Sequence, residues 1–120
     1  MQFDRPILIA GAGIAGLTTA LALAKRGLAS RIVERANVLE EVGAGLQLSP
    51  NALRVMSDLG LLEPLQVAGV TARSVFLKDA RSGRTLARVP VEASDGTPYL
   101  SIHRADLQRV LLQAVQREAA

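Results

Sequence analysis

Residues 5–35 read RPILIAGAGIAGLTTALALAKRGLASRIVER, and this order predicts a strand, a tight turn, a helix and a second strand. The run from Arg5 to Ala10 is aliphatic and ends at glycine, which is typical of a strand buried on both faces of a parallel sheet. Residues 17–26 are rich in Ala and Leu and predict a helix that Gly27 terminates. Residues 31–34 predict the second strand, so the stretch is expected to form a βαβ unit.

The predicted turn reads Gly11-Ala-Gly13-Ile-Ala-Gly16 and fits the pattern G-x-G-x-x-G. By itself the pattern is weak, because 10 glycines in 120 residues produce chance matches. Its position between a strand and a helix makes it specific. Gly11 would permit the sharp turn, Gly13 the close approach of a pyrophosphate, and Gly16 the close packing of helix on strand. The amino end of the helix would offer N–H groups and partial positive charge to phosphates.

Glu34 ends the second predicted strand, where an acidic residue would accept hydrogen bonds from a ribose diol and repel a 2′-phosphate. The sequence therefore predicts an unphosphorylated adenine dinucleotide, FAD or NAD, rather than NADP. Composition and spacing do not separate FAD from NAD. The alternative is a glycine-rich turn that binds no ligand.

Composition excludes several classes of function. The 120 residues suffice for one domain, and the absence of cysteine excludes disulfides, thiolate nucleophiles and cysteine-ligated metal clusters. A single histidine, His103, leaves no multi-histidine metal site. The net charge is +3 without a run of five like charges, and aromatic residues make up 2% of the chain. We therefore expect no metal and no nucleic-acid partner.

Residues 7–24 carry no charge and resemble a membrane span or a secretory leader. Against this alternative, Asp4 offsets Arg5, and three glycines interrupt the stretch. The sequence favours a cytoplasmic chain without a membrane partner.

The remainder of the chain predicts mixed elements. Residues 36–49 show no helical periodicity, Ser49 or Pro50 opens a helix that Gly60 ends, and residues 61–68 add a further turn or two. The alternation in residues 73–79 and 85–91 predicts a β-hairpin, with Gly83 in its loop. The last elements are a short strand over 99–102 and a helix over 104–118, and Arg81, Arg84 and Arg88 are expected to form a solvated basic edge of the hairpin.

The strings ILIAGAGIAGLTTALALAKRG, VERA, EVGAGLQLSPNALRVMSDLGL and IHRADLQRVL resemble the amino-terminal part of the FAD-dependent aromatic hydroxylases. The resemblance is strongest to the salicylate and 3-hydroxybenzoate hydroxylase branch, and residues 65–98 match only loosely. It implies an α/β fold: the N-terminal βαβ unit of a Rossmann-like FAD-binding domain, plus a β-hairpin, in an incomplete domain. Within residues 1–120 it implies a dinucleotide-binding and flavin-facing part (1–70), a hairpin insertion (71–102) and a helix (103–120).

The resemblance also implies roles for individual residues. The FAD pyrophosphate would lie on the three glycines of the turn, and the adenosine ribose on Glu34 and Arg35. The backbone at Gly45 and the side chain of Gln47 would lie along the ribityl chain and flavin, and Arg104 would contact FAD from a helix start. The alternatives are a surface arginine at 104, a turn glutamine at 47, and a capping role for His103 rather than a catalytic one.

The implied activity is hydroxylation of a small aromatic acid such as salicylate or hydroxybenzoate, with NAD(P)H as reductant and O₂ as co-substrate. The flavin would carry the chemistry, so we assign no catalytic residue. The family's Asp-Gly and Gly-Asp fingerprints, which follow further along its chains, do not occur in position here. The alternatives are therefore a non-catalytic FAD- or ADP-binding fragment that needs further chain or a partner, and a dehydrogenase NAD domain, which the segment EVGAGLQLSPN disfavours. A sheet of two parallel strands would leave an apolar edge exposed and favour self-association.

Overall fold

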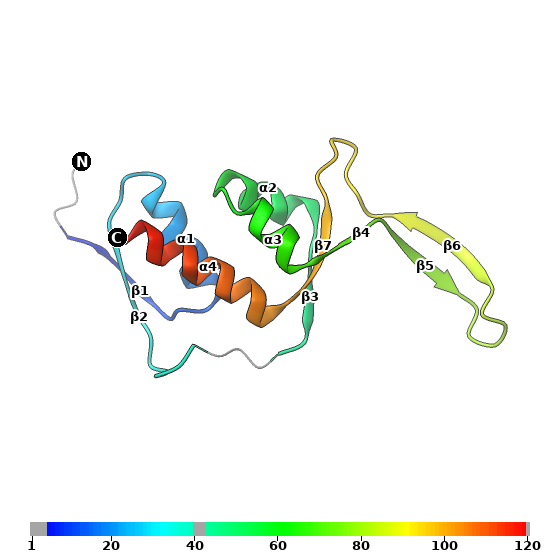
Figure 1. The fold of residues 1–120 in the computed structure, drawn as a ribbon, viewed down its shortest axis with the longest axis horizontal. Helices are drawn as coiled ribbons and strands as arrows, with labels where there is room; N and C mark the ends of the chain where they lie inside the picture. Colours follow the sequence, from blue (N-terminus) through cyan, green and yellow to red (C-terminus); the bar gives the residue numbers. More distant parts are fainter. Residues whose placement is uncertain (1–4, 40–42, 120) are drawn as a thin grey trace.

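The structure is a computed structural model that describes residues 5–39 and 43–119. The predicted βαβ unit forms the amino-terminal part of the fold. Strand β1 (Ile7–Ala10) lies parallel to β2 (Ser30–Val33), and helix α1 (Ile14–Ala24) connects them (Figure 1). The helix begins at Ile14, three residues before the predicted start. Gly16 therefore lies in the first turn of the helix, where the lack of a side chain allows the close approach to the end of β1.

The prediction that the first strand is buried on both faces is wrong. Leu8 is 66% exposed, and Val33 of β2 is 47% exposed. The two strands form a sheet of their own in the described part of the chain, and α1 packs against it. The aliphatic run therefore predicts the strand correctly but not the burial of its side chains, because burial depends on neighbouring elements.

A second, three-stranded antiparallel sheet was not predicted. Its order is β3 (Gly45–Leu48), β7 (Tyr99–His103) and β4 (Val70–Ala72). Only β7 corresponds to a predicted strand. The described residues of 36–49 form no helix, as the sequence predicts, but they include β3, for which the sequence predicts no strand. Short strands with glycine have a weak local signal, and β3 forms through pairing with a segment more than fifty residues away.

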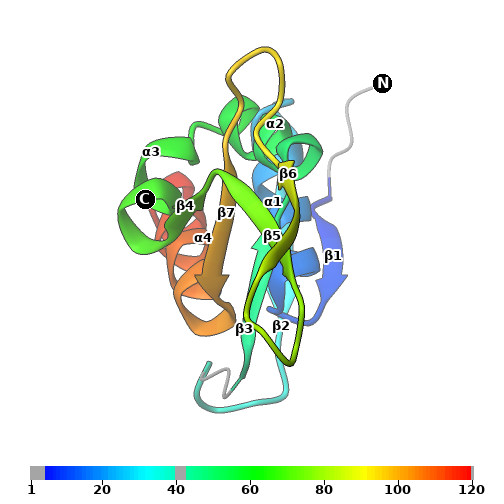
Figure 2. The same cartoon turned by 90° about the vertical axis from the view of Figure 1, so that its right-hand side faces the viewer.

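The predicted hairpin is confirmed and extends away from the helices (Figure 1), so that it faces the viewer in the turned view (Figure 2). It consists of β5 (Ser74–Lys78) and β6 (Thr85–Pro90), with Gly83 at φ +69° in the turn. The basic edge is partly packed against the hairpin itself. The guanidinium of Arg88 lies 5.7 Å from the ring centroid of Phe76, and its Nε donates to Ser74 Oγ at 2.9 Å.

The remaining helices follow their predicted positions closely: α2 (Pro50–Asp58), α3 (Leu62–Ala68) and α4 (Arg104–Glu118). Helix α4 packs beside α1 and also contacts α3 (Figure 1). The core is aliphatic, and its fully buried side chains are Leu17, Leu53, Leu65, Leu100, Leu107 and Leu111. None of the helices within the described ranges has the length and apolar character needed to cross a membrane.

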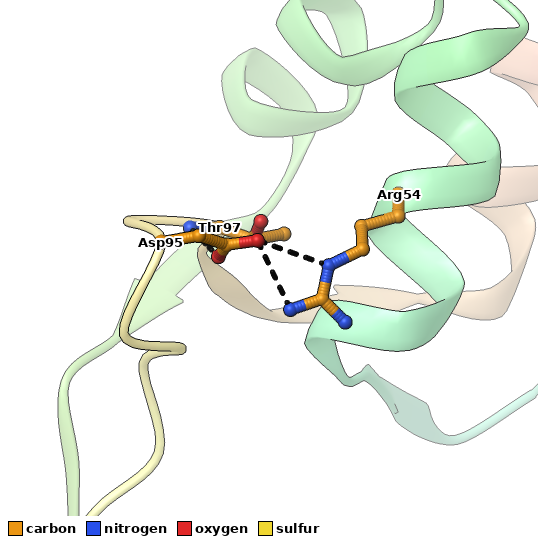
Figure 3. Close-up of polar contacts among 3 residues, drawn as sticks. All are labelled: Arg54, Asp95 and Thr97. Atoms are coloured by element: carbon orange, nitrogen blue, oxygen red, sulfur yellow. Dashed lines mark hydrogen bonds and ion pairs between the residues drawn. The ribbon is translucent and has the colours of Figure 1, made fainter.

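An ion pair ties the loop before β7 to helix α2. Arg54 Nη2 lies 3.1 Å from Asp95 Oδ2, and the Thr97 N–H donates to Asp95 Oδ1 at 3.0 Å (Figure 3). Hydrogen bonds from the backbone and side chain of Thr97, together with Arg54, lower the pKa of Asp95 to about 2. Both members of the ion pair are about half exposed, so the loop geometry at Thr97 matters more than the charge attraction.

We expect Asp95→Asn to remove an acid-sensitive component of stability. A carboxyl with a lowered folded-state pKa stabilises the fold above its ordinary pKa, here 3.8, and this stabilisation is lost as the pH falls through the folded-state value of about 2. Urea unfolding at a series of pH values should show that the difference between the wild type and Asp95→Asn shrinks across this window. Arg54→Met, which keeps the Thr97 bonds, should retain the larger part of the component. A difference curve that is flat with pH would contradict this assignment.

Candidate functional site

The glycine turn brings the start of α1 into backbone contact with the end of β1. Gly11 has φ +102°, and its N–H donates to the carbonyl oxygen of Val33 at 2.7 Å. A Cβ on Gly16 would lie 2.0 Å from the Gly11 carbonyl oxygen and 3.4 Å from Ile9 Cγ2. No side chain fits at 16, in agreement with the tight packing predicted from the sequence.

Gly13 is the N-cap of α1 and faces open space. Its backbone is extended (φ −73°, ψ −177°), and a Cβ there would meet no atom within 4 Å. The bond from the Leu17 N–H to the Gly13 carbonyl oxygen is 3.0 Å long and closes the first turn of the helix. The amides of residues 13–16 precede that bond, so their N–H groups have no acceptor within the helix. This end of α1 is therefore suited to an anionic group.

Glu34 lies at the end of β2, and its carboxylate reaches back to the turn. Oε2 accepts the Ala12 N–H at 2.8 Å, and Oε1 accepts the Ala36 N–H at 2.9 Å. These bonds, the Ala12 bond first, lower the pKa of Glu34, and the charge of Arg35 acts in the same direction. Glu34 is thus an ionised acceptor beside the turn, as the ribose role requires. The role that the structure shows directly is a different one, because the same carboxylate accepts the N–H of Ala12.

Sequence reasoning missed Gln108. It is 5% exposed and is the one buried polar side chain in the part of the chain that the structure describes. Its Nε2 donates to the carbonyl oxygen of Ala12 at 3.2 Å and so joins α4 to the turn. A signal was present in the sequence: Gln108 lies within the apolar stripe of the helix, next to Leu107 and one turn before Leu111.

The start of α4 meets the segment predicted to face the flavin. Gly45 of β3 pairs with His103, the residue before Arg104. A Cβ on Gly43 would lie 3.4 Å from Arg104 Cδ. Arg104 and Gln108 are four residues apart on one helix and share a face, so Arg104 stands on the side of α4 that contacts the glycine turn. His103 is the N-cap residue of α4, but its side chain makes no capping hydrogen bond.

Gln47 is engaged by a neighbour on the exposed face of the three-stranded sheet. The Tyr99 hydroxyl donates to Gln47 Oε1 at 2.7 Å. Residues 45 and 47 share this face, because Leu46 and Leu48 alternate toward the core. The flavin contacts of Gln47 and the ribose contact of Arg35 stay predictions. Glu41 and Val42, which begin the segment EVGAGLQ, lie outside the described residues.

The residues of the turn fit the adenine half of a dinucleotide. Open space at Gly13, N–H groups without an intrahelical acceptor, and an ionised carboxylate at the neighbouring strand end are the three features that a pyrophosphate and a ribose diol need.

Comparison with known proteins agrees with this geometry. The sequence profile of a family described as FAD binding domain matches residues 4–120. The 3-amino-4-hydroxybenzoate 2-monooxygenase of Streptomyces cremeus is 47% identical over 122 residues, covering 97% of this chain and 31% of that enzyme. For 3-hydroxybenzoate 6-hydroxylase 1 of Aquipseudomonas alcaligenes the identity is 41% over 115 residues, covering 92% and 29%. Among solved structures, the tetrameric form of 2-methyl-3-hydroxypyridine-5-carboxylic acid oxygenase has a TM-score of 0.82 at 28% identity, covering 99% of this chain and 31% of that one. The chain thus spans less than a third of the length of these relatives.

Two alanine substitutions should separate the structural role of Gly16 from the predicted ligand contact of Gly13. Gly16→Ala forces a Cβ against the Gly11 backbone, and we expect a loss of about 2 kcal/mol or more in the free energy of unfolding. Gly13→Ala meets open space at an ordinary φ and should change stability by less than about 1 kcal/mol, while its Cβ obstructs a pyrophosphate and weakens FAD binding. Thermal unfolding and FAD titration of both variants test the contrast. Equal melting temperatures for the two variants would argue against the contact at Gly16.

Proposed function

We propose, from the premise that this chain belongs to the FAD binding domain family, that it is the FAD-binding portion of a monooxygenase that hydroxylates a small aromatic acid. The observation that carries the proposal is the glycine turn at the start of α1 with the ionised Glu34 beside it. The hydroxybenzoate enzymes among the relatives support salicylate or a hydroxybenzoate as the substrate class.

In this proposal the chain binds and orients the cofactor. The N–H groups at the start of α1 hold the pyrophosphate, and Glu34 holds the adenosine ribose together with neighbouring Arg35. Arg104 supplies a further cation for the phosphates, and the strand from Gly45 to Gln47 borders the ribityl chain and flavin. Bound FAD supplies the redox chemistry, with NAD(P)H as the electron source and O₂ as the oxygen donor. Because that chemistry belongs to the flavin, we assign no general acid, base or nucleophile to the chain.

A titration of the purified chain with FAD, NAD and ADP tests the proposal. We expect FAD to bind more tightly than NAD or ADP. Glu34→Gln should weaken FAD binding by at least about tenfold, because a charge-assisted acceptor for the ribose is lost. Its matched control is Glu63→Gln, which changes an acidic residue in the first turn of α3 and should leave the affinity unchanged. Equal, weak binding of all three ligands would contradict an FAD-specific site.

A second candidate function is FAD or ADP binding without turnover by the chain itself. The observation that favours it is the coverage of the relatives, about 30% of their length. Oxygen consumption distinguishes the two: NADH oxidation that salicylate or 3-hydroxybenzoate stimulates supports catalysis by the chain, and FAD binding without oxygen consumption supports the second candidate.

We also propose self-association through the β1–β2 sheet, in a cytoplasmic protein that draws on the NAD(P)H pool there. Ile7, Leu8 and Val33 expose apolar surface on this sheet, with Leu8 at 66%. Sedimentation of the chain should give a mass above the 12.7 kDa of a monomer, and Leu8→Glu should shift it toward that value. A wild type that sediments as a monomer at high concentration would rule out this contact.

A further inference from the structure

Both polar backbone groups of Ala12 are held by side chains from distant parts of the chain. Its N–H donates to Glu34 at 2.8 Å, and its carbonyl oxygen accepts from Gln108 Nε2 at 3.2 Å. Ala12 is 4% exposed and Gln108 is 5% exposed, so water does not compete freely for the second bond. A buried carbonyl that lost its donor would be left unsatisfied, which makes this bond costly to remove.

The bond from Gln108 fixes the direction of a different group, the N–H of Gly13. The Ala12 carbonyl and the Gly13 N–H belong to one peptide unit, which is planar and trans, so the two groups point in opposite directions. With the carbonyl held toward α4, the Gly13 N–H points away from that helix. Gly13 is also the residue at which an added Cβ meets open space.

A peptide unit next to glycine needs such a restraint. Glycine permits a wide range of φ and ψ, so without an acceptor or donor to hold it the Ala12–Gly13 unit has several accessible orientations. A ligand that binds only one orientation would then have to select it, which lowers the apparent affinity in proportion to its population.

We propose that Gln108 is a positioning residue of the dinucleotide site, which orients the Gly13 N–H toward the pyrophosphate without touching the ligand. This inference rests on the proposed function. Only the amide NH₂ of the Gln108 side chain can make this hydrogen bond, because the Ala12 carbonyl oxygen accepts and cannot donate. A residue of the same length without a donor therefore keeps the packing and loses the function.

The variants are Gln108→Met and, as a matched control, Gln113→Met, which changes an exposed glutamine of the same helix. Amide hydrogen exchange of the chain without ligand gives the first measurement. We expect Gln108→Met to speed exchange at Ala12 and at Leu17, whose amide is bonded to Gly13, by about tenfold, with Leu111 in α4 unchanged as the internal reference. Gln113→Met should match the wild type. Unchanged exchange at Ala12 in Gln108→Met would overturn the restraint.

Binding gives the second measurement. The FAD affinity of Gln108→Met should fall by about tenfold. Adenosine has no phosphates, so its affinity, measured by NMR chemical-shift titration, should stay as in the wild type. An equal loss for FAD and adenosine would indicate a general structural role and overturn the positioning role, as would unchanged FAD affinity. Absence of FAD binding in the wild type would instead refute the proposed function, and the exchange data would still show whether Gln108 restrains the turn.

Discussion

The backbone contact between Gly16 and the carbonyl oxygen of Gly11 leaves no space for a side chain, and the arrangement of the site depends on it. The contact sets how closely α1 approaches the end of β1, and therefore where the amino end of the helix lies. Strand β2 returns parallel to β1 and places Glu34 beside the same turn. With a larger residue at 16, the helix would have to shift, and the N–H groups of its first turn would shift with it.

Three segments that are far apart in the sequence complete this turn. The glycines come from the first βαβ connection, Glu34 from the end of β2, and Gln108 from α4. Helix α4 also carries Arg104 at its start, where the pairing of β3 with β7 brings Gly45 alongside. The three-stranded sheet thus connects the dinucleotide turn to the segment predicted to face the flavin, and the hairpin β5–β6 lies outside this arrangement (Figure 1).

The parts of the fold that the sequence predicts are those with local signals. Helix α4 has an apolar stripe, and its observed bounds agree with the helix that the periodicity predicts over 104–118. The hairpin has alternating strands and a turn glycine. Strands β3 and β4 were missed because their hydrogen-bond partners lie in β7, and the burial of β1 was overestimated because it depends on neighbouring strands.

The membership of an FAD-binding family follows from the glycine pattern and the resemblance, and the profile match confirms it. The contact of Gln108 with the glycine turn is not predicted, because a single polar residue in an apolar stripe does not identify its hydrogen-bond partner. The ligand contacts of the predicted site residues stay predictions.

The charges around the turn agree with the proposed binding of an unphosphorylated dinucleotide. Helix α1, like α2, has no acidic residue in its first turn, whereas α3 and α4 carry Glu63 and Asp106 there. The partial positive charge at the start of α1 is therefore not neutralised within its own helix and favours an anion. The Glu34 carboxylate accepts the N–H of Ala12, one residue before the N-cap of α1. Its negative charge disfavours a second anionic group beside it. A dinucleotide satisfies both conditions, because its pyrophosphate is anionic and its unmodified ribose diol is a neutral donor. With the ribose at Glu34, as proposed, a 2′-phosphate would place a second anion against this carboxylate, whose lowered pKa keeps it ionised at neutral pH.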